Sequence, residues 1–513
     1  MIAVDSSGPR RADTFGASSE LTSVWRDARN RRLLVVLAVG LFSSYAYFYQ
    51  GGGWNQNTRF ALVRAVLEYG SLSIDPYSDQ TGDRALWQGH YYSDKAPGAS
   101  LLAIVPVGVA RLAARIVGMD PGSEPGIVWT SYLATVVTSG VFTLAAAVSI
   151  VWLSLSWGFS RPAALFAATG YAVASPAWCY ATLFMGHAVA GGSLILAFAA
   201  TVNLGRAAEA RTGHLEWALG LFAGLAVLSD FPSAVPAAII VGLALMQLHD
   251  GNRAVLGRAI GHIAAGGAVA VLILCAYNWM AFASPFRIGY SSEQGFEQLR
   301  SGFFGITYPR LWRIVEILLG SYRGLLPISP VLAVTPIGFV LMARARTTAR
   351  AAWAALSIAA FYIALNASYY YWDGGSTIGP RHIAPALPFL GLGLAPVWDW
   401  SRVAGRALLV CAWMWGVALT LIAVSTTPQP PVRFERPFAQ LLVPAFLDGD
   451  LALNTQGFTD YLPYARIEPG QRVTKVSWNV GMKLGLTGLM SLVPLALIWA
   501  ASAALLAVPT DDA

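Results

Sequence analysis

Long runs of apolar residues, separated by short polar connections, dominate the pattern of this 513-residue chain. A helix needs about 20 mostly apolar residues to cross a bilayer. Runs of this kind predict membrane spans at residues 33–49, 127–156, 163–181, 187–204, 215–231, 233–248, 261–281, 325–343, 351–368, 382–398, 407–425 and 484–507. We therefore predict an all-α, polytopic membrane protein with about 12 transmembrane helices.

One further apolar stretch, residues 97–117, contains arginines near its end. If it does not cross, every short basic loop lies on one side, which the positive-inside rule assigns to the cytoplasm. If it crosses, all of these loops lie outside. We therefore interpret it as a juxtamembrane or re-entrant helix. The protein is then expected in a bacterial inner membrane, with both termini cytoplasmic.

The composition supports the membrane assignment. The chain is 56% hydrophobic and only 12% charged, whereas soluble domains carry about 25% charged residues. Its net charge of +7 comes from arginines scattered through short loops. Membrane orientation explains that distribution better than a phosphate-binding stripe for nucleic acid does. The three cysteines have neither disulfide nor metal spacing.

Four segments describe the expected organisation. Residues 1–32 lack periodicity and are interpreted as a disordered cytoplasmic tail. Residues 33–425 form the transmembrane domain, including a first outer loop at 50–126. Residues 426–483 form an outer loop or small cap, and residues 484–513 the last span and a cytoplasmic C-terminus. The outer segments are long and rich in Trp, Tyr, Asp, Asn and Gly, as functional loops often are.

The first outer loop contains two candidate helix starts. Asn55 or Asn57 could cap a surface helix that lies along the membrane and ends at Gly70. Further on, Asp94 could cap a helix with Pro97 in its first turn. Free backbone N–H groups and Lys95 would then meet at one point and attract phosphate. The alternative is that Lys95 only extends toward lipid headgroups.

Two other outer segments repeat this arrangement of a cation beside a helix start. Arg323 lies at the outer end of one span, and Arg381 and His382 lie at the outer start of another. Lys95, Arg323 and Arg381 could converge on one anionic headgroup, since arginine binds phosphate in a bidentate manner. Anchoring at the membrane rim is the alternative for each cation taken alone.

Aromatic and histidine side chains accompany these cations. The aromatic residues are Trp54, Trp87, Tyr91, Tyr92, Tyr369, Tyr370, Tyr371 and Trp372. They form either an interfacial belt or a platform for a sugar ring. His187 opens a span, either as a hydrogen-bonded rim residue or as a divalent-metal ligand beside Asp94. Asp230 is expected to cap the helix that follows it.

The topology and the first outer loop resemble the GT-C superfamily of membrane glycosyltransferases, which use polyprenyl-phosphate sugars. The resemblance is closest to the family 39-like branch, with protein O-mannosyltransferases and lipid A aminoarabinose transferases. It rests on QNTRFALVRAVLEYG, which begins at Gln56, and on Asp94-Lys95-Ala96-Pro97. It implies that Lys95 contacts the lipid-linked phosphate and that Asp94 can bind a divalent metal ion. No nucleotide cofactor is expected.

The chain departs from this family at the general base. The family has an acidic pair where this chain has Gln56 or Asn57, and an amide cannot accept a proton at neutral pH. Asp94 is our first choice for the base and Asp373 the second. The other candidates are Asp75, Asp79 and Asp83. We expect the substrate to contact Gln56, Asn57, Arg59, Trp87, Tyr92, Tyr371 and His382.

The expected activity is transfer of a sugar from a polyprenyl-phosphate donor to a lipid, polysaccharide or protein acceptor on the outer face. One alternative is a non-catalytic binding or assembly protein, which Gln56 and Asn57 favour because the base is missing. The other is a flippase or transporter of the lipid-linked sugar. A transporter requires ionisable residues within its spans, and apart from Asp230 at an outer edge the spans contain almost none.

Overall fold

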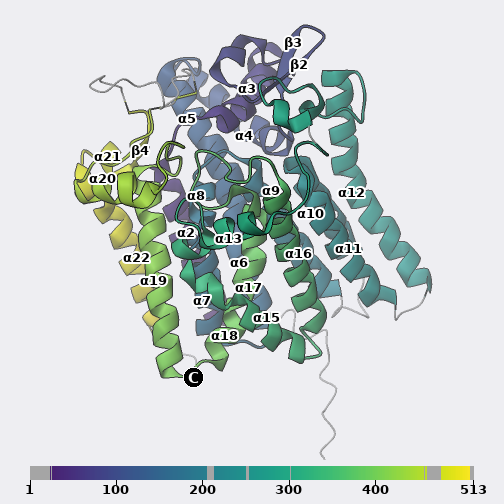
Figure 1. The fold of residues 1–513 in the computed structure, drawn as a ribbon, viewed down its shortest axis with the longest axis vertical. Helices are drawn as coiled ribbons and strands as arrows, with labels where there is room; N and C mark the ends of the chain where they lie inside the picture. The colour runs from purple at the N-terminus through teal and green to yellow at the C-terminus, as the bar shows by residue number, and fades with distance from the viewer. Residues whose placement is uncertain are drawn as a thin grey trace, which may run out of the picture.

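Helices make up almost all of the regular structure of the protein (Figure 1). The computed structural model describes residue 24 and residues 26–204, 213–249, 253–300, 302–455, 457–458 and 475–508. The strands among these residues form two short antiparallel pairs. These are β1 (Phe48–Tyr49) with β4 (Trp478–Asn479), and β2 (Arg84–Trp87) with β3 (His90–Ser93). The prediction of an all-α fold is confirmed.

Eight helical segments among the described residues are long and apolar enough to cross a membrane. They are Gly98–Ile116, Glu124–Ser156, Gly186–Leu204, Phe231–Leu248, Ala254–Phe282, Ala349–Ser368, Val403–Thr426 and Gly488–Ala507. The other predicted spans are also helical. Most are shorter or are broken at Pro and Gly residues, and the first, Ala28–Ala46, carries several arginines near its start. The protein is a multi-pass membrane protein, as its apolar runs predicted.

The first span, α2 (Ala28–Ala46), begins earlier than its apolar run. The Asp27 carboxylate accepts hydrogen bonds from the backbone N–H groups of Arg29 and Asn30 and so fixes the helix start. The predicted disordered tail is therefore wrong for residues 28–32. Residues 1–23 of that predicted tail lie outside the described residues.

Helix α3 (Trp54–Tyr69) follows β1 and is buried over most of its length, not exposed on the membrane surface as predicted. Its N-cap is Gly53, with a φ of 115° that favours glycine. The predicted caps Asn55 and Asn57 are wrong, because both side chains bind other groups. Gly70 ends the helix in the left-handed conformation, as predicted.

The first half of the bundle consists of α4 to α12. Its elements are α4 (Gly98–Ile116), α5 (Glu124–Thr135), the π-helical turn η2 (Val136–Gly140), α6 (Val141–Ser156), α7 (Arg161–Ala172), α8 (Ala177–Ala181), α9 (Gly186–Leu204), α10 (His214–Ser229), η3 (Phe231–Ser233), α11 (Ala234–His249) and α12 (Arg253–Phe282). Helices α10 and α12 pack closely because Gly220 and Gly266 face the partner backbone. A Cβ at Gly220 would lie 2.0 Å from the carbonyl oxygen of Ile263. Small residues bring membrane helices together in this way.

The second half begins with η4 (Gly289–Ser292) and η5 (Glu297–Arg300). It continues through α13 (Leu311–Leu319), α14 (Leu325–Ile328), η6 (Pro330–Val334), α15 (Thr335–Arg344), α16 (Ala349–Ser368), η7 (Arg381–Ala386), α17 (Leu387–Leu392), α18 (Leu394–Trp400), α19 (Val403–Thr426), η8 (Phe438–Leu442), α20 (Val443–Leu447), α21 (Val480–Lys483), η10 (Gly488–Leu492) and α22 (Val493–Ala507). The predicted outer cap, residues 426–483, includes η8 and α20. Its residues 456 and 459–474 lie outside the described residues, so its extent stays a prediction.

Helix α4 has both of its ends on the same side of the bundle, although its length and composition would allow it to cross. Its first residue packs on the end of α10, where a Cβ at Gly98 would lie 2.4 Å from Oγ of Ser229. Its other end leads through residues 117–123 into the start of α5. This placement agrees with our interpretation of residues 97–117 as a juxtamembrane helix.

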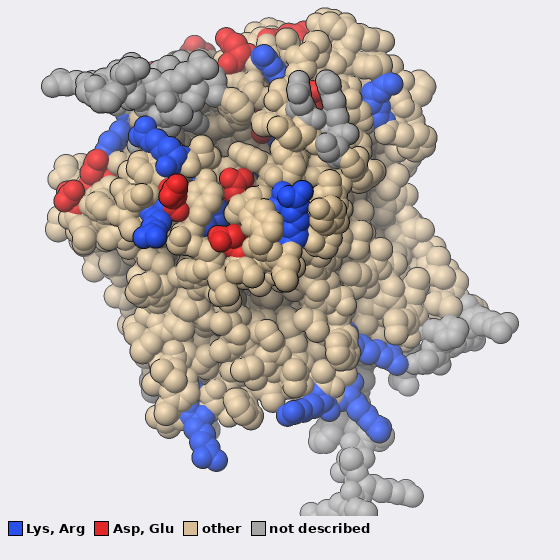
Figure 2. Space-filling model, viewed as in Figure 1, with Lys and Arg blue, Asp and Glu red and all other residues tan. Residues whose placement is uncertain are grey.

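The two ends of the bundle differ in charge. On the face drawn in Figure 2, Asp and Glu lie only toward the end that carries β2 and β3, whereas Lys and Arg lie at both ends. A broad band without charged residues separates the ends, as expected of a surface in contact with lipid. Arg32 of α2 donates to the carbonyl of Val508, so α2 begins where α22 ends. Assignment of this end to the cytoplasm stays a prediction.

Candidate active site

A cavity of about 300 Å³ lies at the end of the bundle that carries α3 and the β2–β3 hairpin. Six parts of the chain meet around it: the start of α3, the hairpin with Lys95, Met185 before α9, the segment after α12, the segment between α16 and η7, and the segment after α19. Its polar lining residues are Asn55, Asp83, Lys95, Ser376, Arg381 and Gln429. Its aromatic lining residues are Trp54, Tyr290, Phe296, Tyr369, Tyr370 and Tyr371.

Lys95 is held between two carboxylates in this cavity. Its Nζ lies 2.6 Å from Asp94 and 3.2 Å from Asp83, and its side chain is 13% exposed. Burial lowers the pKa of Lys95, but the two carboxylates more than offset this and hold it well above its usual value. Lys95 is therefore a permanent cation. The predicted cap by Asp94 is wrong, because α4 has Pro97 as its N-cap and no side-chain cap.

Arg381 contributes a second cation from a distant part of the chain. It opens η7 and lines the same cavity as Lys95. Its buried Nε has no hydrogen-bond partner among the described residues. Gly374, Gly375 and Gly379 precede it, with φ values of 71°, 67° and 69°. These left-handed conformations favour glycine and turn the chain so that Tyr371 and Arg381 reach the same space.

Arg323, the third cation of the predicted cluster, has a different environment. It is 1% exposed, and its Nη2 donates to the carbonyl of Gly375 at 2.7 Å. It is not among the residues that line the cavity. Burial lowers the pKa of Arg323, and the carboxylate of Asp373 partly offsets this. Arg323 thus supports the glycine-rich segment, and of the three predicted cations the cavity brings together only Lys95 and Arg381.

The amide residues at the start of α3 bind the backbone. Nε2 of Gln56 donates to the carbonyls of Gly51 and Gly52, both at 2.7 Å, and its Oε1 accepts from the N–H of Phe184 at 2.7 Å. Gln56 is 1% exposed and does not line the cavity. Asn57 donates to the carbonyl of Gln80 at 2.7 Å. The expected contact of Gln56 with substrate therefore has no support in this geometry.

Arg59 lies one helical turn further along α3. Its Nη1 donates to the carbonyl of Ala96 at 2.8 Å, and its Nε donates to the side chain of Asn55 at 3.1 Å. It is 4% exposed. Arg59 therefore holds the residue after Lys95 and the side chain of Asn55, and both Lys95 and Asn55 line the cavity.

Two further aromatic candidates, Trp87 and Tyr92, lie on the hairpin and not in the cavity lining. The Trp87 ring is covered by the guanidinium of Arg287, 3.6 Å from its centroid. Tyr92 packs on Phe282 at the end of α12, with ring centroids 5.3 Å apart. Neither lines the cavity. Tyr92 thus packs against the end of α12, and Trp87 against the segment that follows α12.

The histidines pair with one another and with Asp230. Nδ1 of His187 lies 3.6 Å from Asp230, and its ring centroid lies 5.9 Å from that of His382. Nε2 of His382 lies 3.3 Å from the carbonyl oxygen of Tyr371. The predicted cap by Asp230 is wrong, since its side chain makes no capping hydrogen bond.

A metal held by Asp94 and His187 does not fit this arrangement. Among the described residues, no group of three or more His, Cys, Asp or Glu side chains is placed to bind a metal ion. His187 is paired with Asp230. The ammonium group of Lys95 already occupies the position of a cation between Asp83 and Asp94. We derive no step through a metal.

Comparison with known proteins identifies the architecture. The structure is similar to the crystal structure of ArnT from Cupriavidus metallidurans bound to undecaprenyl phosphate, with a TM-score of 0.50 and 16% sequence identity. The similarity covers 82% of this chain and 70% of that one. The chain has the GT-C fold. ArnT in the apo state gives a TM-score of 0.49, and neither a family model nor a curated protein matches the chain.

Several residues that line the Lys95 cavity were not predicted from the sequence. Tyr290, Phe296 and Gln429 lie in outer segments without a recognisable motif. Asp83 had been only one of several alternative bases, yet it both lines the cavity and pairs with Lys95. The available signal was its position beside the turn that leads into the hairpin, but a sequence does not show which acidic residue of a loop faces inward.

Proposed function

We propose that this protein transfers a sugar from a polyprenyl-phosphate donor to a hydroxyl-bearing acceptor at the outer face of the membrane. The observation that carries the proposal is the convergence of Lys95 and Arg381 on one cavity. The GT-C fold supports it, as does the undecaprenyl phosphate bound to ArnT in a structure of the same fold. The acceptor is a lipid, a polysaccharide or a protein.

The two cations have complementary roles at the phosphate. Arg381 has a fork of N–H groups suited to phosphate oxygens, and its Nε has no hydrogen-bond partner among the described residues. Lys95 adds a point charge that Asp83 and Asp94 hold in place. As the bond between the sugar C1 and the phosphate oxygen breaks, both cations stabilise the negative charge that remains on the phosphate.

Asp94 acts in this proposal on Lys95 and not on the acceptor. Its side chain is 1% exposed and lies behind Lys95 as seen from the cavity, whose lining does not include it. A carboxylate in that position orients the ammonium group. Asp373, our second choice for the base, is likewise absent from the lining. Asp83, one of the alternatives, does line the cavity but pairs with Lys95 at 3.2 Å, so we look for the base elsewhere.

The aromatic wall of the cavity provides a surface for the sugar. Tyr370 and Tyr371 stack with ring centroids 5.9 Å apart, and Tyr369 packs edge-on against Tyr370 at 4.9 Å. The C–H faces of a pyranose pack favourably on aromatic rings, while its hydroxyls reach polar neighbours. Asn55, Ser376 and Gln429 are the neutral polar residues of the lining.

The experiment that tests this proposal is release of undecaprenyl phosphate from a panel of undecaprenyl-phosphate sugars. Purified protein in nanodiscs is incubated with each donor and a membrane extract as the source of acceptor. We expect release with at least one donor, and loss of release in Lys95→Ala. The matched control is Lys483→Ala, whose cation lies over Trp478, away from the cavity. Absence of release with every donor contradicts the proposal.

A further inference from the structure

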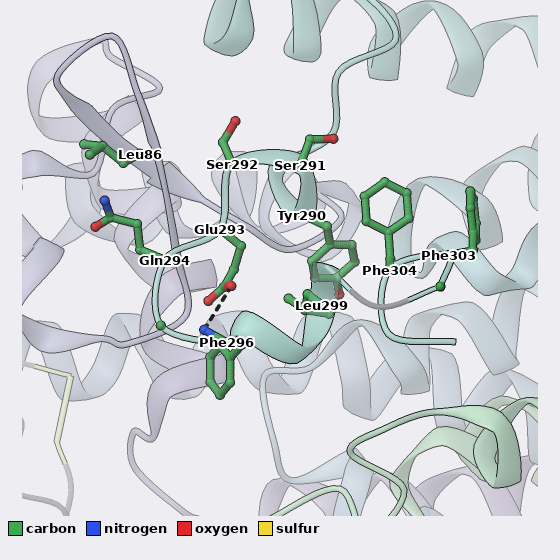
Figure 3. A pocket seen from close by; sticks show the side chains of 12 residues that line it. Leu86, Tyr290, Ser291, Ser292, Glu293, Gln294, Phe296, Leu299, Phe303 and Phe304 are labelled. Atoms are coloured by element: carbon green, nitrogen blue, oxygen red, sulfur yellow. Dashed lines mark hydrogen bonds between the residues drawn. The ribbon is translucent and has the colours of Figure 1, made fainter. Parts of the chain in front are cut away.

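A second, larger cavity of about 590 Å³ adjoins the first. Figure 3 shows it between the β2–β3 hairpin and the segment that carries η4 and η5. The two cavities share Tyr290, Phe296 and Leu299 as lining residues. The two cavities are therefore neighbours, with these side chains facing both.

The lining of the second cavity suits an uncharged carbohydrate. Tyr290, Phe303 and Phe304 provide ring surfaces on one side, and Ser291, Ser292 and Gln294 provide neutral hydrogen-bonding groups (Figure 3). Among the lining residues whose side chains the structure describes, none is a cation. Aromatic surfaces combined with hydroxyl and amide groups are the chemistry that recognises sugars.

Glu293 is the one charged residue among the described lining residues of this cavity. Its Oε2 accepts a hydrogen bond from the N–H of Phe296 at 3.2 Å, which fixes the carboxylate (Figure 3). Its Oε1 is buried and has no hydrogen-bond partner among the described residues. A buried carboxylate oxygen without a partner is costly, and an acceptor hydroxyl would supply the missing hydrogen bond.

The backbone holds Glu293 in register with the hairpin that leads to Lys95. Glu293 forms an antiparallel bridge with Ala85, and the N–H of Gln294 donates to the carbonyl of Arg84 at 3.1 Å. Gly289 packs so closely on Asp94 that a Cβ there would lie 2.6 Å from the Asp94 Cα. The segment that carries Glu293 is therefore fixed directly against the site of the donor phosphate.

The electrostatic surroundings of Glu293 match those of a general base near neutral pH. Burial and the carboxylate of Asp94 raise the pKa of Glu293 to about 7, although Lys95 acts to lower it. A base with a pKa near the working pH transfers protons most efficiently. The charges of Asp94 and Lys95 at the donor site therefore act on the pKa of Glu293.

We propose that the second cavity binds an uncharged carbohydrate acceptor and that Glu293 is the general base that accepts its hydroxyl proton. This inference rests on the proposed transferase function. The acceptor oxygen forms a bond to the sugar C1, and the bond between C1 and the phosphate oxygen breaks. The electron pair of that bond stays with polyprenyl phosphate, and the hydroxyl proton moves to the Glu293 carboxylate.

Azide tests this role without knowledge of the natural acceptor, because the azide ion attacks C1 without losing a proton. The variant Glu293→Ala is incubated with the donor that the parent protein uses. We expect transfer to the acceptor in membrane extract to fall by about 10²–10⁴-fold, the usual contribution of general base catalysis. Added azide restores release of undecaprenyl phosphate and yields the glycosyl azide. Transfer by Glu293→Ala at the parent rate, or no restoration by azide, overturns the assignment.

Two controls separate this inference from the proposed function and from misfolding. Glu316→Gln removes a carboxylate of α13 outside both cavities and should leave transfer unchanged. Binding of undecaprenyl phosphate to Glu293→Ala in nanodiscs should equal that of the parent, because the donor site is intact. Failure of the parent itself to use any donor contradicts the proposed function, whereas parental activity that Glu293→Ala retains contradicts only the present inference.

The class of acceptor is tested with two soluble probes. Maltotriose, an uncharged oligosaccharide, should inhibit transfer by the parent protein, and trigalacturonic acid, its anionic counterpart, should not. Ser292→Trp, which fills the second cavity, should abolish transfer to the extract acceptor and keep undecaprenyl phosphate binding. Inhibition by trigalacturonic acid, or by neither probe, contradicts an uncharged carbohydrate in this cavity.

Discussion

The ammonium group of Lys95 lies 2.6 Å from the carboxylate of Asp94, and both side chains are almost enclosed by protein. The pair leaves Lys95 in the cavity lining and Asp94 behind it. Two residues that are adjacent in the sequence thus have different surroundings, and we assign them different roles. In the proposed function Lys95 contacts the donor phosphate, and Asp94 keeps the lysine charged and in place.

This division of roles predicts that substitution of Lys95 and of Asp94 will lower the rate of transfer by different factors. Lys95→Ala removes the cation and should lower transfer by about 10²–10³-fold, the range measured when one electrostatic donor is removed from an active site. Asp94→Asn should lower it less, because Asp83 still holds Lys95 at 3.2 Å. Undecaprenyl phosphate release by both variants measures the difference. A larger loss for Asp94→Asn than for Lys95→Ala would show that Asp94 has the more direct role.

Gln56 should resist conversion to the acidic residue that the family resemblance implies. A carboxylate at this position would keep an acceptor for the N–H of Phe184 but would place a second oxygen against the carbonyls of Gly51 and Gly52. We expect Gln56→Glu to destabilise the protein by about 2 kcal/mol or more, since buried polar groups lose their partners. Thermal unfolding in nanodiscs measures this. Gln88→Glu, in the exposed turn of the hairpin, is the matched control and should leave the unfolding temperature unchanged.

The helical architecture could be predicted from the sequence, but the hydrogen-bond partners of individual side chains could not. Apolar runs are long and mark the spans without reference to the rest of the fold. Caps depend on single hydrogen bonds, and at the four predicted capping positions another group took the place of the expected backbone N–H. Asn55 and Asp94 bind side chains close in sequence, Arg59 and Lys95. Asn57 and Asp230 bind distant residues, Gln80 and His187, which a local pattern cannot show.

For the same reason, some of the predicted site residues line the cavity and others do not. Lys95 and Arg381 are about 290 positions apart in the chain, yet each stood beside a Pro and at a helix start, and both line the cavity. Arg323 stood in a similar pattern but faces the protein interior. Glu293 had no motif at all, and only the pairing of its segment with the hairpin brings it near Lys95.

Arg323 should contribute to the stability of the protein, whereas Arg381 should contribute to the binding of undecaprenyl phosphate. Arg323→Ala removes the hydrogen bond to Gly375 and should destabilise the protein by about 1–3 kcal/mol. Arg381→Ala should leave stability nearly unchanged and weaken undecaprenyl phosphate binding by about 10–100-fold, as expected for a lost charged hydrogen bond. Thermal unfolding and lipid binding in nanodiscs distinguish them. Equal effects of both substitutions on lipid binding would place Arg323 at the phosphate as well.

Gly289 tests the coupling between the two cavities. A Cβ at this position would lie 2.6 Å from the Asp94 Cα and 2.8 Å from its carbonyl oxygen. Gly289→Ala should therefore push the Glu293 segment away from the donor site and lower transfer by about tenfold, equivalent to about 1.4 kcal/mol in the barrier. Donor binding should change less than the rate. Gly295→Ala, at a position with open space around it, tests backbone strain alone because its φ is 108°.

The rate of transfer should depend on pH through Glu293. The base acts in its ionised form, and burial together with the carboxylate of Asp94 raises the pKa of Glu293 to about 7. The carboxylate of Asp83 also raises the pKa of Glu293, and Lys95 lowers it. Glu293 in turn raises the pKa of Tyr370. Transfer should therefore rise with pH up to about 7 and fall about tenfold for each unit below it. Glu293→Gln should lack this acidic limb, and an unchanged limb in that variant would assign the titration to another group.

The measurement that tests the account most directly is release of undecaprenyl phosphate from undecaprenyl-phosphate sugars by the purified protein. The parent protein, Lys95→Ala and Glu293→Gln are compared in nanodiscs with membrane extract as acceptor. The account predicts release by the parent, weakened lipid binding and little release by Lys95→Ala, and lipid binding without release by Glu293→Gln. Intact lipid binding by all three proteins, with release from none, would contradict a transferase and indicate a protein that only binds the lipid.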